Sequence, residues 1–318
     1  MTMKPFAFVF PGQGSQAVGM LDAWGDHPAV RQTLDEASSA LGQDLATLIH
    51  KGPKEDLALT TNTQPVMLVA GVAAYRAWLA EGGAVPAAVA GHSLGEYAAL
   101  VAAEVINLAE AVPLVRLRAQ AMQEAVPVGQ GAMAAILGLS AAQVIEGCAQ
   151  AQASCGPGSA EVVDAANFND PAQTVIAGSK AAVDKACELL KGMGAKRALL
   201  LPVSAPFHSR LMKPAAERLQ TRLAEITLQA PRIPVVNNID VAVESDPARI
   251  RDALYRQAFG PVRWVECVQA IKARGIGAVI ECGPGKVLAG LTRRIDAELL
   301  GGAVFDPASL HETRTLLS

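Results

Sequence analysis

Residues 85–103 have the sequence VPAAVAGHSLGEYAALVAA, which contains the pentapeptide Gly91-His92-Ser93-Leu94-Gly95. The apolar residues before the pentapeptide predict a short buried strand, and those after it predict a helix. A G-x-S-x-G sequence between a strand and a helix is typical of a nucleophile elbow, a sharp turn that exposes a serine hydroxyl. The backbone N–H of Leu94 lies at the helix N-terminus, where it is placed to donate to a developing oxyanion. Ser93 is therefore a candidate nucleophile for acyl chemistry; the alternative is a glycine-rich turn in which the serine caps the helix.

The composition is that of a globular chain with a well-filled core. The chain has 318 residues and a formal net charge of -3, and 51% of its residues are hydrophobic. The lack of a basic excess argues against nucleic-acid binding. Five cysteines without a C-x-x-C pair argue against a disulfide framework or a zinc site and favour a reducing compartment. Because there is no signal-peptide pattern and no apolar stretch of about 18 residues, we expect a cytoplasmic protein without a membrane segment.

The order of the predicted elements indicates two domains. Short apolar strands alternate with helical patterns along most of the chain, which is typical of α/β proteins. Between residues 131 and 201 the order becomes β-α-β-β-α-β, a ferredoxin-like pattern, with helix caps at Ser140 and Ser179. We therefore expect a large α/β-hydrolase-like domain with a parallel sheet, formed by residues 1–130 and 202–318, and a small ferredoxin-like domain inserted at 131–201. The cleft between two such domains is a natural acyl-binding site.

Two finer expectations concern segments with weaker patterns. Residues 161–167 and 173–177 are expected to be strands, joined by a loop over 168–172. Residues from about Asp306 to Ser318 show no clear pattern, so this tail is expected to be loosely held.

His208 is the strongest candidate for the base that a serine nucleophile requires. Among the five histidines, it follows residues 203–207 at the point where the small domain returns to the large one. The alternative is a solvated loop histidine. A base normally needs a third group to orient its ring, but none of the acids that follow His208 stands out. These acids are Asp240, Glu244, Asp246 and Asp252.

Arg118 lies on the apolar face of a predicted helix that Asn107 caps. A buried arginine must find a partner, and its planar fork suits a substrate carboxylate. From the spacing alone, a snorkelling arginine or an internal salt bridge is the commoner arrangement. Pro113 predicts a kink or a late start of this helix, because proline has no N–H to donate.

Residues 12–17 match G-x-G-x-x-A after a predicted strand, which is a weak dinucleotide-binding fingerprint. Pro11 interrupts the junction between strand and turn, and no acidic residue is a clear ribose acceptor. A loop that places backbone donors or the amide of Gln13 at the cleft fits this sequence better.

Several motifs occur in one order along nearly the whole chain. They are Phe10-Pro11-Gly12-Gln13-Gly14-Ser15-Gln16, Thr63-Gln64-Pro65, Gly91-His92-Ser93-Leu94-Gly95-Glu96, Arg118, Asn167-Phe168-Asn169, Pro206-Phe207-His208 and Gly283-Pro284-Gly285. In this order they resemble the malonyl-CoA:acyl carrier protein transacylases of bacterial fatty acid synthesis, and they are similar to the acyltransferase domains of polyketide synthases. The resemblance implies that Ser93 is the nucleophile, that His208 is the base, and that the Gln13 loop and the Leu94 N–H form the oxyanion hole.

The resemblance implies roles for five further residues. Arg118 would clamp a malonyl carboxylate, and the backbone carbonyl of Gln257, rather than a carboxylate, would hold the histidine. Gln64 and Asn167 are candidates for lining the cleft. Phe207 resembles the bulky residue of malonyl-selecting variants, which crowds an α-methyl group.

The implied reaction transfers a malonyl group from malonyl-CoA to the phosphopantetheine thiol of acyl carrier protein through a malonyl-serine, without a metal or redox cofactor. A serine hydrolase or thioesterase, a non-catalytic paralogue, and an acyltransferase for a polyketide or malonate-pathway carrier are the alternatives. The resemblance makes a monomer the expected state. Because carrier proteins are usually acidic, a local basic patch is expected. Its candidates are Arg116, Lys196, Arg197, Lys286 and Arg293.

Overall fold

The computed structural model describes residues 4–156 and 158–318. Its larger sheet has five parallel strands in the order β7-β2-β1-β8-β9. The central strand, β1 (Phe6–Phe10), pairs with β2 (Ala88–Gly91) and β8 (Ala278–Cys282), and the edges are β7 (Val235–Val236) and β9 (Leu300–Val304). The predicted α/β architecture with a parallel sheet is confirmed.

Alternating side chains of β1 enter two different cores. Phe6, Phe8 and Phe10 face the helices α4 (Thr60–Ala80) and α5 (Gly95–Ala102), and Phe8 meets Trp78 edge to face. Ala7 and Val9 face the opposite side, where α11 (Trp264–Ala273) and α12 (Val287–Ile295) pack. The strand is therefore buried on both faces, as parallel sheets require.

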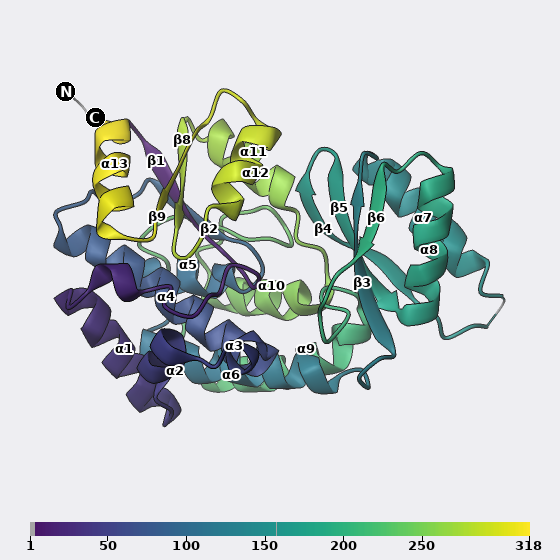
Figure 1. Ribbon diagram of the computed structural model, residues 1–318, viewed down its shortest axis with the longest axis horizontal. Coiled ribbons are helices and arrows are strands. Elements are labelled where there is room, and N and C mark those ends of the chain that lie inside the picture. Colours follow the sequence, from purple (N-terminus) through teal and green to yellow (C-terminus); the bar gives the residue numbers. More distant parts are fainter. Residues whose placement is uncertain (1–3, 157) are drawn as a thin grey trace.

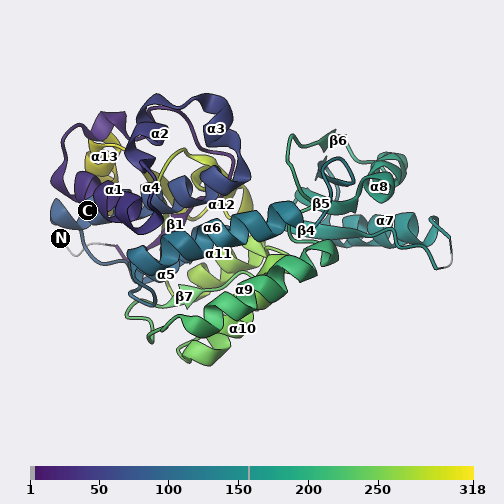
Figure 2. The same ribbon diagram turned by 90° about the horizontal axis from the view of Figure 1, so that it is seen from below.

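The remaining helices of the larger domain surround this sheet (Figures 1 and 2). They are α1 (Pro28–Leu41), α2 (Leu45–Lys51), α3 (Lys54–Ala58), α6 (Leu108–Glu124), α9 (Lys213–Glu225), α10 (Pro247–Phe259) and α13 (Pro307–Leu317), with short 3₁₀ helices at Asp22–Trp24 and Arg210–Met212. No helix within residues 4–156 and 158–318 is long and apolar enough to cross a bilayer.

The chain end is a packed helix, so the expectation of a loosely held tail is wrong. Helix α13 begins with a capping box between Asp306 and Ser309. Leu310 and Leu317 are buried, and the Leu317 carbonyl accepts a hydrogen bond from the Lys4 N–H. Apolar contacts with β9 and the backbone hydrogen bond to Lys4 hold this helix, and the hydrogen bond joins parts of the chain that are distant in sequence.

The second sheet is antiparallel, with the order β4-β5-β3-β6. Its elements follow the predicted β-α-β-β-α-β order and form the teal lobe of Figure 1, which the chain enters after α6 and leaves before α9. They are β3 (Gly131–Leu137), α7 (Ala141–Ala153), β4 (Val163–Asp170), β5 (Gln173–Ser179), α8 (Lys180–Gly192) and β6 (Arg197–Leu200). We propose residues 131–201 as the limits of this small domain.

Two local expectations in the small domain are wrong. Strand β4 continues to Asp170, and only Pro171 and Ala172 connect it to β5, so residues 168–170 belong to the strand rather than to a loop. Ser140 forms its predicted capping box, but Ser179 does not cap α8. The Ser179 hydroxyl instead accepts the Val162 N–H at 3.1 Å.

Strand β4 also joins the two domains. The Phe168 N–H donates to the Val262 carbonyl, and the Val262 N–H donates to the Ala166 carbonyl, both at 2.9 Å. At the end of β4, the Asp170 carboxylate pairs with Arg294 of α12 at 2.7 Å. These contacts fix the small domain beside the carboxyl end of the parallel sheet.

Candidate active site

Ser93 occupies a sharp turn between β2 and α5, as the predicted elbow requires. Its φ of 53° is in the left-handed region, which costs a non-glycine residue about 1–2 kcal/mol. The flanking glycines, Gly91 and Gly95, do not themselves adopt this left-handed conformation. They allow the backbone segments on either side of the turn to approach each other closely. A Cβ on Gly91 would lie 1.9 Å from the backbone of Gly95, and one on Gly95 would lie 2.0 Å from the Phe10 carbonyl oxygen. The strand, turn and helix therefore pack tightly enough to hold the serine in its strained conformation.

His208 lies against the serine hydroxyl. Its Nε2 is 2.6 Å from the Ser93 Oγ, and its Nδ1 is 2.9 Å from the Gln257 carbonyl oxygen and 3.2 Å from that of Gly260. Because carbonyl oxygens only accept, Nδ1 carries the hydrogen and Nε2 accepts the Ser93 hydroxyl proton. The arrangement is that of a serine nucleophile with its base.

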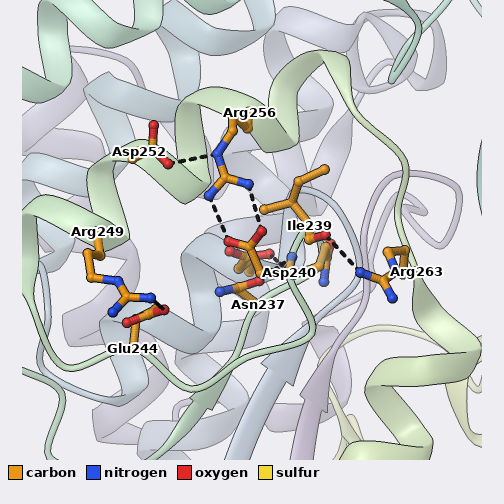
Figure 3. A network of polar contacts seen from close by, with 10 residues as sticks. Asn237, Ile239, Asp240, Glu244, Arg249, Asp252, Arg256 and Arg263 are labelled. Carbon is orange, nitrogen blue, oxygen red and sulfur yellow. Dashed lines mark hydrogen bonds and ion pairs between the residues drawn. The ribbon is translucent and has the colours of Figure 1, made fainter.

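The acids that follow His208 in sequence lie elsewhere (Figure 3). Asp240 and Asp252 both pair with Arg256, and Glu244 pairs with Arg249. The Asp246 side chain caps α10. The third group that orients the histidine is therefore a pair of backbone carbonyls.

Burial lowers the pKa of His208 to about 3, and the positive charge of Arg118 acts in the same direction. Only 4% of His208 is exposed, so it is not the solvated loop histidine of the alternative interpretation. The imidazole is therefore neutral, and able to accept a proton, well below the usual pKa of histidine near 6.5.

The Arg118 guanidinium reaches the same serine from α6. Its Nη2 donates to the Ser93 Oγ and to the Gln257 Oε1, each at 3.2 Å, and its Nη1 donates to the Gln64 Oε1 at 2.7 Å. Arg118 is 2% exposed, which excludes a snorkelling side chain. Within residues 4–156 and 158–318 it has no ion pair with a carboxylate, and its buried Nε has no hydrogen-bond partner. A buried cation that is paired with no carboxylate, beside a candidate nucleophile, suits an anionic substrate group.

The helix that carries Arg118 excludes one of the two alternatives for Pro113, the late start. Asn107 caps it as predicted, and α6 begins at Leu108, so Pro113 does not delay its start. Gln64 lies within the first turns of α4.

These residues surround a pocket of about 210 Å³ between the two sheets. The predicted site residues Gln13, Gln64, Leu94, Asn167 and Phe207 all line it, together with Ser93, His208 and Arg118. The structure adds lining residues that sequence analysis did not assign. They are His92, Met122, Met133, Asn169, Val175, Leu201 and Val203.

Asn169 and His92 meet across the pocket, where the His92 Nε2 lies 2.8 Å from the Asn169 Oδ1. Asn169 belongs to a motif that carried the family resemblance, but its contact with His92 spans the two domains and has no local sequence signal. The loop after β1 carries Gln13 and leads to a short 3₁₀ helix at Asp22–Trp24, so the helix of a dinucleotide fingerprint does not follow. In the described part of the chain, no cluster of His, Cys, Asp and Glu has the arrangement of a metal site.

The family model for the acyl transferase domain matches residues 7–297. The chain belongs to the acyl transferase family. This acyl transferase is 53% identical to the malonyl CoA-acyl carrier protein transacylase of Escherichia coli K12 over 97% of this chain and 98% of that protein. It is 43% identical to the protein of that name from Bacillus subtilis, over 97% and 96% of the two chains. The predicted family resemblance is confirmed.

Solved structures of related transferases have the same fold as this acyl transferase. The acyl-carrier-protein S-malonyltransferase from Burkholderia pseudomallei is 65% identical, with a TM-score of 0.95 over 98% of this chain and 99% of that chain. A malonyl-transacylase solved in complex with its type II polyketide synthase acyl-carrier protein is 49% identical, with a TM-score of 0.93 over 96% and 98% of the chains.

Proposed function

We propose that this acyl transferase moves the malonyl group of malonyl-CoA to the phosphopantetheine thiol of acyl carrier protein through a malonyl ester of Ser93. One observation carries the choice of acyl group. The Arg118 Nη2 lies 3.2 Å from the Ser93 Oγ, is buried, and has no carboxylate partner in the described residues. A malonyl group would supply that partner, because a single methylene separates its carboxylate from the carbonyl that Ser93 attacks.

In the first half-reaction, His208 Nε2 takes the proton of Ser93 as Oγ bonds to the thioester carbonyl carbon. The resulting oxyanion would be held by the Leu94 N–H and by donors of the Gln13 loop, and such a donor is worth about 3 kcal/mol in comparable enzymes. The intermediate collapses as the carbon–sulfur bond breaks, and His208 returns the proton to the departing CoA thiolate. In the second half-reaction the carrier thiol gives its proton to His208 as its sulfur bonds to the carbonyl carbon of malonyl-Ser93. The ester carbon–oxygen bond then breaks, and His208 returns the proton to the Ser93 Oγ.

The clamp and the base are electrostatically coupled in this scheme. The charge of Arg118 lowers the pKa of His208 and disfavours the imidazolium that forms during attack. A malonyl carboxylate paired with Arg118 would offset that charge, so the correct substrate strengthens the base. An acyl group without a carboxylate would leave the buried Arg118 guanidinium unpaired. The charge of Arg118 would then continue to lower the pKa of His208.

The pH dependence of Ser93 acylation follows from the lowered pKa of His208. Because the neutral, active form persists below pH 6.5, the acylation rate should stay within about threefold between pH 7.5 and 5. An unperturbed histidine would instead lose about 30-fold of its neutral form at pH 5. Single-turnover acylation, followed by quenched intact-mass measurement with the folded fraction monitored at each pH, would reveal such a fall if the assignment were wrong.

Transfer and hydrolysis can be separated by the fate of malonyl-enzyme. We expect intact mass to show one malonyl group on the enzyme after incubation with malonyl-CoA, and rapid discharge when phosphopantetheinylated carrier protein is added. Without carrier, free malonate should form slowly. Rapid malonate release in both conditions would favour the serine hydrolase or thioesterase alternative.

Basic side chains available for an acidic carrier protein lie on both domains. Lys196 and Arg197 are exposed at β6, and Lys286 and Arg293 are exposed at α12. Arg116 is half-buried and donates to Gln43 and Asn62, so it is a poor candidate for this patch. The monomeric state and the cytoplasmic location stay predictions, and fatty acid synthesis is the process that we propose.

A further inference from the structure

Glu96 is a buried acid next to the nucleophile that the proposed chemistry does not use. It follows the elbow in α5, is 2% exposed, and forms no ion pair with Lys or Arg in the described residues. One of its oxygens, Oε2, accepts two hydrogen bonds, from the backbone N–H of Asn238 at 2.9 Å and from the Gln257 Nε2 at 3.0 Å.

Both partners of Glu96 hold the peptide groups of Ser93. The Asn238 Oδ1 accepts the Ser93 N–H at 2.8 Å, while its Nδ2 donates to the Gly91 carbonyl at 2.7 Å. The Gln257 Nε2 donates to the Ser93 carbonyl at 3.0 Å. The donors and acceptors around them therefore set the orientations of the Asn238 and Gln257 side-chain amides. A closed ring of hydrogen bonds runs from Ser93 through Asn238, Glu96 and Gln257 back to Ser93.

Gln257 connects this ring to the base and to the clamp. Its backbone carbonyl accepts the His208 Nδ1 proton, and its Oε1 accepts from the Arg118 Nη2. A displacement of Gln257 would therefore move the nucleophile, the base and the carboxylate clamp together. Asn238 and Gln257 are both fully buried, so water cannot replace a lost partner.

We propose that Glu96 is a positioning residue that holds Ser93 in its left-handed conformation through Asn238 and Gln257. The inference rests on the proposed role of Ser93. A left-handed non-glycine residue persists only where its surroundings fix it, and here the fixing groups converge on one carboxyl oxygen. Burial raises the pKa of Glu96 to about 7 despite these hydrogen bonds, so the protonated carboxyl is populated near neutrality.

The variants Glu96→Gln and Glu96→Met separate the acceptor from the bulk of the side chain. Glutamine keeps an oxygen that accepts both hydrogen bonds, so its acylation rate at saturating malonyl-CoA should stay within about threefold of wild type. Methionine fills similar space without an acceptor, and it should slow acylation about 100-fold, because small displacements of reacting atoms have effects of that size. The KM for malonyl-CoA should change less than about threefold, since Glu96 does not line the pocket and Gln64 still holds the Arg118 guanidinium through its Nη1.

Glu281→Met is the matched control. Glu281 is also a fully buried acid, on β8, and its Oε2 accepts the Ala289 N–H at 2.9 Å, but it does not line the pocket. This variant should lose thermal stability and keep its acylation rate per folded molecule. Wild-type acylation by Glu96→Met, or equal slowing by Glu281→Met, would overturn the proposal.

Two further measurements keep the test decisive. If Glu96→Met does not fold, Gln257→Met removes the hydrogen bond between Gln257 and Glu96, together with those from the Gln257 side chain to the Ser93 carbonyl and to Arg118, but keeps the backbone carbonyl for His208. This variant should also slow acylation about 100-fold, and a wild-type rate would overturn the proposal. A fluorophosphonate probe, which phosphonylates the serine with loss of fluoride, reports Ser93 reactivity without a malonyl group. If wild type reacts with the probe but not with malonyl-CoA, the proposed substrate fails, while the probe rates of the Glu96 variants still decide the positioning role.

Discussion

Ser93→Ala is expected to abolish the malonyl-enzyme and to lower malonyl transfer by a factor on the order of 10⁴ or more. The Ser93 Oγ is the atom that approaches His208 Nε2, at 2.6 Å, and the Arg118 Nη2, at 3.2 Å. Alanine removes this atom but keeps the backbone hydrogen bonds of residue 93 to Asn238 and Gln257. The fold should therefore survive, and intact mass with malonyl-CoA should show no added malonyl group.

Ser204→Ala provides a control for the loss of a hydroxyl near the cleft. Its Oγ contacts the Thr60 Oγ1 at 3.2 Å, and it does not line the pocket. This variant should form malonyl-enzyme at the wild-type rate. A malonyl adduct that persists in Ser93→Ala would refute the assignment of the nucleophile.

Arg118→Ala is expected to lower kcat/KM for malonyl-CoA about 100-fold, which corresponds to about 3 kcal/mol for a buried charge pair. Transfer from acetyl-CoA should fall far less, because an acetyl group has no carboxylate to pair. Removal of the guanidinium should also raise the pKa of His208, since Arg118 contributes to its depression. Paired measurements of kcat/KM with malonyl-CoA and acetyl-CoA would give the ratio directly.

Two variants of the same helix sharpen this comparison. Arg118→Lys keeps the charge but not the planar fork, so its malonyl preference should fall between those of wild type and Arg118→Ala. Arg116→Ala is the control, because Arg116 donates to Gln43 and Asn62 away from the pocket. Equal losses with both acyl-CoA substrates in Arg118→Ala would mean that the arginine supports the site without reading the carboxylate.

Local patterns predicted the parts of the site that local geometry creates. The apolar run before Ser93 and the helical run after it are sufficient to predict an elbow, because a strand, a tight turn and a helix depend mainly on neighbouring residues. The apolar stripe that contains Arg118 placed this arginine beside the core but left a snorkelling side chain open. Neither pattern could distinguish a substrate clamp from an internal salt bridge, since that depends on what lies opposite the helix.

The chain end shows the opposite case. The segment after Asp306 lacks a strong periodic pattern, yet it forms α13, whose buried leucines contact the body of the domain. Helix stability here comes from tertiary packing more than from intrinsic propensity. Similarly, Ser179 has the residue type of a helix cap but gives its hydroxyl to the Val162 N–H, because the neighbouring strand places that donor nearby.

The sequence alone determined the family, the α/β class with its inserted unit, and the identities of Ser93, His208 and Arg118 as candidates. The family resemblance also implied that the Gln257 carbonyl holds His208. Only the tertiary structure decided that these side chains meet, that the Gly260 carbonyl also accepts from His208, and that Glu96 and Gln257 tie them together. Ser93 and His208 are 115 positions apart, and Ser93 and Gln257 are 164 apart. Contacts over such separations arise from how sheets and helices pack, and residue periodicity describes only the face that each element buries. The pentapeptide around Ser93 thus specifies a sharp turn that exposes a serine, and packing around that turn brings His208, Arg118 and the buried carboxyl of Glu96 beside it.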